Sequence, residues 1–262
     1  MNELIITSPQ NPRIKELASL GSKSSERRKR ALFIVEGTRE CRAAQKAGFE
    51  FETLYMVPGL SDEKFISSLK ADNIITISPQ VYEKVAYRGT TEGVVAIVRH
   101  KELKLDDIKL SENPLVIVLE SVEKPGNLGA ILRTADAAKA DAVIICDPLT
   151  DLYNPNTIRS SLGGIFTNQV VACSSEETYK WLKKNKIQIF TAELQASVWY
   201  HLTDMKKPMA IVMGTESDGL KEFWRERADQ RIKIPMRGEL DSLNVSVSTA
   251  IICFEALRQR DV

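Results

Sequence analysis

Six continuous apolar runs in the C-terminal half of the chain constrain its fold more than any other feature. They are LVIVLE (115–120), AVIIC (142–146), NQVVA (168–172), IQIFTAE (187–193), PMAIVM (208–213) and IKIP (232–235). Helical or polar stretches separate them. Strands whose residues are apolar throughout, rather than at every second position, are typical of a parallel sheet with helices on both faces. The pattern predicts an α/β domain over residues 113–262.

A similar alternation in the N-terminal part predicts a smaller α/β domain over residues 1–99. Its strand candidates are FIVE (33–36), TLYMV (53–57), IITI (74–77) and GVVAIV (93–98). Helical patterns lie between them. The stretch from 100 to 112 is charged and lacks an apolar period, so we expect it to be the linker between the two domains.

Charge and cysteine usage exclude several classes of protein. The net charge of +1 excludes a globally basic chain, yet the segment 13–30 holds seven basic and two acidic residues. Four widely spaced cysteines and two histidines indicate neither a disulfide framework nor a zinc site. No apolar run approaches the length of a membrane span and no signal pattern opens the chain. We expect a cytoplasmic protein in a reducing compartment, with no metal and no membrane partner.

The stretch 214–248 carries two polar, glycine-bearing loops, each directly after a buried apolar run. Ligands of open α/β sheets bind outside the carboxyl ends of the strands, where such loops meet. The first loop, GTESDG (214–219), is neither a P-loop nor GxGxxG, and a simple strand-to-helix turn explains it equally well. The two loops together predict a small-molecule site.

Two further segments carry more polar groups than their helices need. In NLGAILR (127–133), Arg133 follows three apolar residues, so its guanidinium either reaches back to solvent or points into a site. In SLNVSVS (242–248), polar residues gather before an apolar helix, where one N-cap would suffice. Each segment alone is also compatible with ordinary helix capping.

Taken together and in this order, three segments resemble the three motifs of the SpoU–TrmH family of RNA ribose methyltransferases, within the SPOUT superfamily. The segments are NLGAILRTADA (127–137), IVMGTESDGL (211–220) and IKIPMRGELDSLNVSVSTAIICFEAL (232–257). The N-terminal TSPQNPRIKELASL with FIVEGTRE resembles the L30e-like substrate-binding domain that many members carry. No position expected to be functional departs from the family pattern.

The resemblance implies a C-terminal domain tied into a deep trefoil knot, which chain physics alone would not predict. It also implies that S-adenosylmethionine binds among the knot loops. By position, Gly214, Ile234 and Leu243 are expected to contact this cofactor through backbone atoms, with Thr191, Met236 and Val245 as wall residues. An apolar slot with a few backbone donors and acceptors suits an adenine ring.

The resemblance further implies a catalytic role for Arg133, supported by Asn127, Glu216, Ser242 and Asn244. Arginine is often assigned in this family as the base for the ribose 2′-hydroxyl. A protonated guanidinium has no acceptor atom, however, so we favour an orienting or charge-stabilising role. A pairing of Glu216 with Arg133 is expected.

The basic N-terminal segment is expected to bind the RNA backbone, although a solvated charged face is the simpler interpretation in isolation. The expected contacts are Arg13, Lys15, Lys23, Arg27, Arg28 and Arg30. Tyr87, Arg88 and Thr90 lie in a polar loop that could contact unpaired bases.

The resemblance implies a homodimer formed through the C-terminal domain and a 2′-O-methyltransferase for ribosomal RNA, with the large subunit favoured. Transfer RNA as substrate, and an RNA-binding module without catalysis, stay open as alternatives. A nucleotide-dependent oxidoreductase is disfavoured because EKPGNLGA (123–130) does not supply its glycine pattern.

Overall fold

A computed structural model describes residues 5–86, 92–149, 151–195, 198–215 and 218–261. The chain forms two compact units. The first comprises residues 1–101 together with 151–167, and the second comprises 102–150 together with 168–262. Each unit has its own sheet and is described separately.

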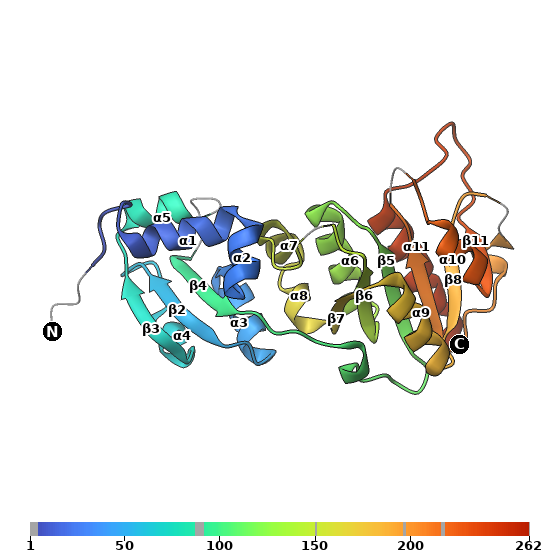
Figure 1. Ribbon diagram of the computed structural model, residues 1–262, viewed down its shortest axis with the longest axis horizontal. Helices are drawn as coiled ribbons and strands as arrows, with labels where there is room; N and C mark the ends of the chain where they lie inside the picture. The colour runs from blue at the N-terminus through green and yellow to red at the C-terminus, as the bar shows by residue number, and fades with distance from the viewer. Residues whose placement is uncertain (1–4, 87–91, 150, 196–197, 216–217, 262) are drawn as a thin grey trace. The chain divides into compact units, whose positions relative to one another are not determined.

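The sheet of the first unit is mixed and has four strands in the order β1-β4-β2-β3 (Figure 1). Its strands are β1 (Leu32–Glu36), β2 (Phe51–Met56), β3 (Ala71–Thr76) and β4 (Val94–Arg99). β4 pairs antiparallel with both β1 and β2, whereas β2 and β3 run parallel. The prediction of a small N-terminal α/β domain is confirmed.

The helices of this unit begin at residues that suit helix starts. Asn11 accepts a hydrogen bond from the Arg13 amide and Pro12 opens α1, while Ser78 caps α5. Helices α1 and α5 place Leu17, Leu20 and Val81 in the core. The helices are α1 (Pro12–Ser22), α2 (Ser24–Arg30), α3 (Thr38–Lys46), α4 (Glu63–Ser68), α5 (Pro79–Val85), α7 (Pro155–Ser160) and α8 (Gly164–Thr167).

Residues 151–167 pack into the first unit although they come from the C-terminal half of the sequence. The Tyr153 ring stacks on Phe33 of β1 with centroids 4.1 Å apart, and Phe166 lies against Phe49. Asp151 forms an ion pair with Arg27 at 2.6 Å. Aromatic pairs and a buried ion pair therefore hold this segment on the N-terminal sheet.

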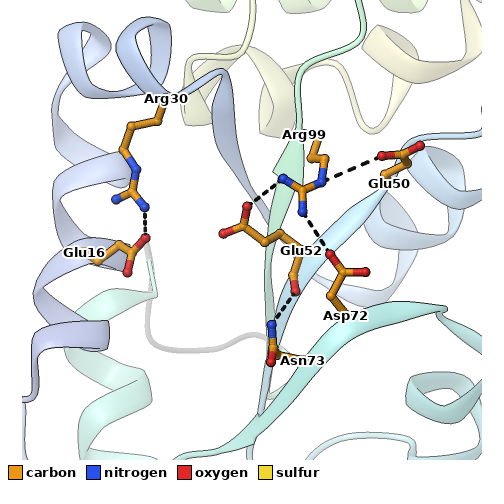
Figure 2. Close-up of polar contacts among 7 residues, drawn as sticks. All are labelled: Glu16, Arg30, Glu50, Glu52, Asp72, Asn73 and Arg99. Atoms are coloured by element: carbon orange, nitrogen blue, oxygen red, sulfur yellow. Dashed lines mark hydrogen bonds and ion pairs between the residues drawn. The ribbon is translucent and has the colours of Figure 1, made fainter.

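Arg99, at the end of β4, connects three strands through their carboxylates (Figure 2). Its guanidinium lies 2.9 Å from Glu52 of β2 and 2.9 Å from Asp72 of β3, and 3.7 Å from Glu50. Exposed ion pairs of this kind contribute little free energy each, but together they compensate the charge of Arg99.

The second unit contains a seven-stranded sheet in the order β7-β6-β5-β10-β8-β11-β9, and every pairing between its described strands is parallel. The parallel sheet predicted from the apolar runs is confirmed. The two-residue β9 was not predicted. The strands are β5 (Leu115–Glu120), β6 (Ala142–Cys146), β7 (Val170–Cys173), β8 (Gln188–Ala192), β9 (Val198–Trp199), β10 (Met209–Met213) and β11 (Gln230–Lys233).

Helices cover both faces of this sheet. On one face, Trp181 and Leu182 of α9 and Trp224 of α10 pack over Val116 and Val212. α6 packs against α11, which also contacts β10. The helices are α6 (Pro125–Ala137), α9 (Ser175–Lys184), α10 (Glu222–Arg227) and α11 (Val245–Arg260), with short 3-10 turns η1 (Leu105–Asp107) and η2 (Tyr200–Leu202). The trefoil knot itself stays a prediction.

Candidate functional site

A cavity of about 700 Å³ lies at the carboxyl ends of three neighbouring strands of the second unit, β8, β10 and β11. Three segments contribute to the lining: 192–195 at the end of β8, the described residues 213–215 and 218–220 at the end of β10, and residues between 233 and 248, which run from β11 into α11. The volume is that of a typical small-molecule pocket. The two loops singled out in the sequence thus meet at one site, and a third loop joins them.

The loop after β10 closes on itself at Gly214. Thr215 and Gly219 exchange backbone hydrogen bonds of 3.1 and 3.2 Å. A Cβ atom on Gly214 would lie 2.2 Å from the carbonyl carbon of Gly219, so no other residue fits there without moving the backbone. Gly219 has φ +67°, which also favours glycine. The absence of a side chain at Gly214 therefore lets the loop pack closely against its own backbone beside the cavity.

Glu120, at the end of β5, fixes the far end of the same loop. Its Oε2 accepts a hydrogen bond of 2.8 Å from the Lys221 amide, just before α10 begins. Burial raises the pKa of Glu120, and the Lys221 amide opposes that rise. The carboxylate thereby ties the start of α10 to the central part of the sheet.

One wall of the cavity is built around the buried carboxylate of Glu193. Arg231 of β11 donates two hydrogen bonds of 2.7 Å to its two oxygens, and the Thr191 hydroxyl donates a third at 2.9 Å. Burial raises the pKa of Glu193, but the hydrogen bonds from Arg231 and Thr191 outweigh burial and leave the pKa below its ordinary value. Arg225 lies 3.5 Å from the same carboxylate. This network joins the ends of β8, β11 and α10.

A second part of the lining is largely apolar and comes from the stretch between β11 and the first turn of α11. Ile234, Met236, Leu243 and Val245 line it. Val245 is buried, whereas Leu243 is 40% exposed and so can still be covered by a ligand. A cavity lined by both apolar and charged residues suits a molecule with one aromatic end and one ionic end.

Asn127 and Asn244 bring two of the sequence motifs together. The Nδ2 of Asn244 donates to the Oδ1 of Asn127 at 3.1 Å, and Asn244 caps α11 by accepting from the Ser246 amide. Ser242 lies in the cavity lining next to Asp241, to which its hydroxyl donates. Arg133 is exposed on α6, and its side chain has no hydrogen bond or ion pair with the residues that the structure describes.

Five of the six residues expected to contact a cofactor line the cavity: Gly214, Ile234, Met236, Leu243 and Val245. Thr191 does not line it, because its fully buried side chain supports Glu193 instead. Glu216, expected to pair with Arg133, lies outside the described residues, as do Tyr87, Arg88 and Thr90. The assigned roles of these residues remain predictions.

Arg27 requires a correction. Its side chain is 2% exposed, and it donates to the carbonyl of Leu20 and to the carboxylate of Asp151. The guanidinium is therefore used within the fold and does not face a phosphate. Arg30 is partly exposed and pairs with Glu16 (Figure 2). Arg13, Lys15, Lys23 and Arg28 are exposed on or beside α1 and α2.

Glu193 and Arg225 are lining residues that sequence reasoning missed. Glu193 ends the apolar run IQIFTAE, and a carboxylate directly after a buried strand was the signal available. Arg225 lies in a short polar helix where nothing distinguishes it from its charged neighbours.

The described residues hold no group of three or more His, Cys, Asp or Glu that could bind a metal ion. None of the helices in the described ranges is long and apolar enough to cross a membrane.

Comparison with known proteins gives matches along almost the whole chain. The SpoU rRNA Methylase family matches residues 114–254, and the MRM3-like substrate binding domain matches residues 11–96. The 23S rRNA (guanosine(2553)-2′-O)-methyltransferase RlmP of Bacillus subtilis is 30% identical over 252 residues, covering 95% of this chain and 97% of that protein.

Solved structures agree with the sequence matches. A crystal structure of an RNA 2′-O ribose methyltransferase has a TM-score of 0.86 and 38% identity, covering 99% of this chain and 100% of the other. The AdoMet-bound rRNA methyltransferase from Sinorhizobium meliloti has a TM-score of 0.89 and 30% identity, covering 97% of each chain. The resemblance inferred from the three motifs is confirmed, and the chain belongs to the SpoU rRNA methylase family.

Proposed function

We propose that this chain is an S-adenosylmethionine-dependent methyltransferase that modifies a ribose 2′-hydroxyl of ribosomal RNA. The observation that carries the proposal is the cavity at the ends of β8, β10 and β11, which is lined by Gly214 together with the apolar residues Ile234, Met236, Leu243 and Val245. A relative named as a 23S rRNA 2′-O-methyltransferase, which matches 95% of this chain, supports the choice of substrate.

The residues present fit this cofactor. The apolar residues Ile234, Met236 and Leu243 can cover an aromatic ring, and Gly214 lines the same cavity without a side chain. When bound, S-adenosylmethionine supplies a methyl group already activated on a sulfonium centre. The protein then has to bind the two substrates, exclude water and hold the hydroxyl in line with that methyl group.

Arg133 is the residue that we assign to the hydroxyl or to the negative charge that develops on it. It is exposed on α6 and has no partner among the described residues, so its guanidinium is available to RNA. Asn127 precedes it on the same helix, and the bond to Asn244 ties that helix to α11. The two asparagines thereby support the placement of Arg133, and we assign Glu216 and Ser242 to the same site.

We assign RNA backbone contacts to Arg13, Lys15, Lys23, Arg28 and Arg30, and a base or backbone contact to Arg88. The match of residues 11–96 to a substrate binding domain supports this assignment. We take residues 1–99 as the substrate-binding domain, 100–112 as the linker and 113–262 as the methyltransferase domain. Residues 151–167 pack with the first of these.

We further propose a cytoplasmic homodimer formed through the C-terminal domain. Support comes from α11, on which Val247 is 46% and Phe254 is 49% exposed. These residues are seven positions apart and therefore share one helix face. A second copy of the chain would remove that apolar face from water.

Mapping of 2′-O-methyl groups in total RNA from a deletion strain tests the proposed function. One ribosomal position should lose its methyl group when the gene is deleted and regain it with the wild-type gene, but not with Arg133→Ala. If a transfer RNA position loses its methyl group instead, the substrate is transfer RNA and not ribosomal RNA. An unchanged methylation map would contradict the function.

A further inference from the structure

Arg225 lines the cofactor cavity beside Glu193, but the carboxylate of Glu193 is already hydrogen-bonded to another arginine, Arg231. Both oxygens of Glu193 accept hydrogen bonds from Arg231, and one also accepts from Thr191. Arg225 approaches the same carboxylate only at 3.5 Å, and its Nε is buried without a hydrogen bond to any described atom. The carboxylate of Glu193 therefore compensates the charge of Arg231 well and the charge of Arg225 only poorly.

Arg225 is held close to the glycine loop. Its Nη2 lies 3.9 Å from the point where a Cβ on Gly219 would sit, and both residues line the cavity. The side chain is 37% exposed, so part of the guanidinium remains free to meet a ligand. Its backbone is fixed in α10, whose start Glu120 holds through the Lys221 amide. The charge is therefore positioned before any ligand arrives.

The two walls differ in the chemistry that they offer. The apolar wall of Ile234, Met236, Leu243 and Val245 suits a flat ring, whereas Arg225 presents a forked cation to the rest of the cavity. A guanidinium matches a carboxylate with two parallel hydrogen bonds. An amino-acid carboxylate is the only anionic group of the proposed cofactor.

We propose that Arg225 binds the carboxylate of the methionine end of S-adenosylmethionine and so fixes which end of the cofactor faces which wall. The inference rests on the proposed function. Lys233 is another cation in the lining, at the end of β11, but its single ammonium cannot form the forked pair. Arg225 is therefore a specificity residue for a cofactor that carries an amino-acid end.

Calorimetry with two ligands tests this assignment without any turnover. S-adenosylhomocysteine carries the carboxylate, and 5′-methylthioadenosine has the same nucleoside without the amino-acid end. Arg225→Ala should weaken S-adenosylhomocysteine binding by about tenfold or more, the usual loss for a charged hydrogen bond. Binding of 5′-methylthioadenosine should stay within about twofold. Arg225→Lys should recover part of the affinity lost in Arg225→Ala, because lysine restores the positive charge but cannot form the two parallel hydrogen bonds of a guanidinium.

Lys233→Ala is the matched control and should affect the two ligands equally. If Arg225→Ala unfolds, Arg225→Gln takes its place and should show the same selective loss. Equal losses for both ligands, no loss, or a selective loss in Lys233→Ala alone would overturn the assignment. So would a loss confined to RNA affinity. A wild-type chain that binds neither ligand would overturn the proposed function as well.

Discussion

Asn244 donates a hydrogen bond of 3.1 Å to Asn127 across 117 positions of sequence. The bond joins the start of α11 to the first turn of α6, the helix that carries Arg133. Two motifs that are far apart in the chain are therefore coupled directly at the site.

Because the two amides act as a pair, we predict that their substitutions are not additive. Asn127→Ala and Asn244→Ala should each lower the methyl-transfer rate, and the double variant should be little worse than the more damaging single variant. Coupling of about 0.5–3 kcal/mol is usual for residues in contact. Single-turnover rates of the wild type, the two single variants and the double variant complete a double-mutant cycle that measures this coupling. Fully additive effects would show that the bond has no role in catalysis.

Gly214→Ala should abolish cofactor binding and lower the stability of the second unit. The added methyl group would lie 2.2 Å from the Gly219 backbone, so the loop must open. Gly238→Ala, in a neighbouring loop where a Cβ meets nothing within 4 Å, is the matched control and should bind normally. Calorimetry with S-adenosylhomocysteine and thermal unfolding measure both effects. Normal binding by Gly214→Ala would contradict the role of this loop.

The N-terminal basic segment should determine how RNA affinity depends on salt. Alanine at Arg13, Lys15, Lys23 and Arg28 together should flatten the plot of log affinity against log salt. Each lost phosphate contact lowers the slope by roughly 0.7–0.9. Arg27 is left unchanged because it holds Asp151 inside the fold. Alanine at the exposed Lys64 and Lys70 of the same unit is the control and should leave the slope alone. If the quadruple variant keeps the wild-type slope, the basic segment is only a charged surface exposed to solvent and does not bind RNA.

Glu255 of α11 should stabilise the fold in a pH-dependent way. Hydrogen bonds from Arg258, opposed in part by burial, lower the pKa of Glu255 from 4.5 to about 2. A carboxyl group whose pKa is lower in the folded than in the unfolded state stabilises the fold at pH values above its unfolded-state pKa. This stabilisation is lost as the pH falls towards the folded-state pKa. The advantage of wild type over Glu255→Gln in urea unfolding should therefore shrink between pH 4.5 and 2. Glu239→Gln, on an exposed loop, controls for the loss of a charge. A difference that stays constant from neutral pH to pH 2 would disprove this pairing.

Much of the fold could be predicted because apolar runs and helix starts are local signals. The predicted runs 115–120 and 208–213 contain β5 and β10, and the two cavity loops that were singled out in the sequence follow predicted strands. The pairing of Glu193 with Arg231 could not be predicted, because it depends on the register of β8 against β11. The burial of Arg27 could not be predicted either, because its partner Asp151 is 124 positions away in the sequence. Cross-strand register and long-range packing leave no mark in a single sequence.

Arg133 should act on the transition state and little on binding. Arg133→Ala is expected to lower the single-turnover rate by about 10²-fold, the range of acid–base or oxyanion groups. Affinities for S-adenosylhomocysteine and RNA should stay within a few-fold. Arg133→Lys separates two roles: recovery that grows with pH would indicate a base, and no recovery would indicate the orienting role that we favour. An Arg133→Ala protein with wild-type rate would remove Arg133 from the reaction.

The central claim is methyl transfer to a ribose oxygen, and nucleoside analysis of the product tests it most directly. Ribosomal RNA from the deletion strain is incubated with the purified chain and S-adenosylmethionine labelled in the methyl group, then digested and analysed by mass spectrometry. We predict that the label appears in one 2′-O-methylnucleoside at a single ribosomal position, and that the Arg133→Ala protein forms it far more slowly. Label on a nucleobase, or no label in any RNA, would contradict the account.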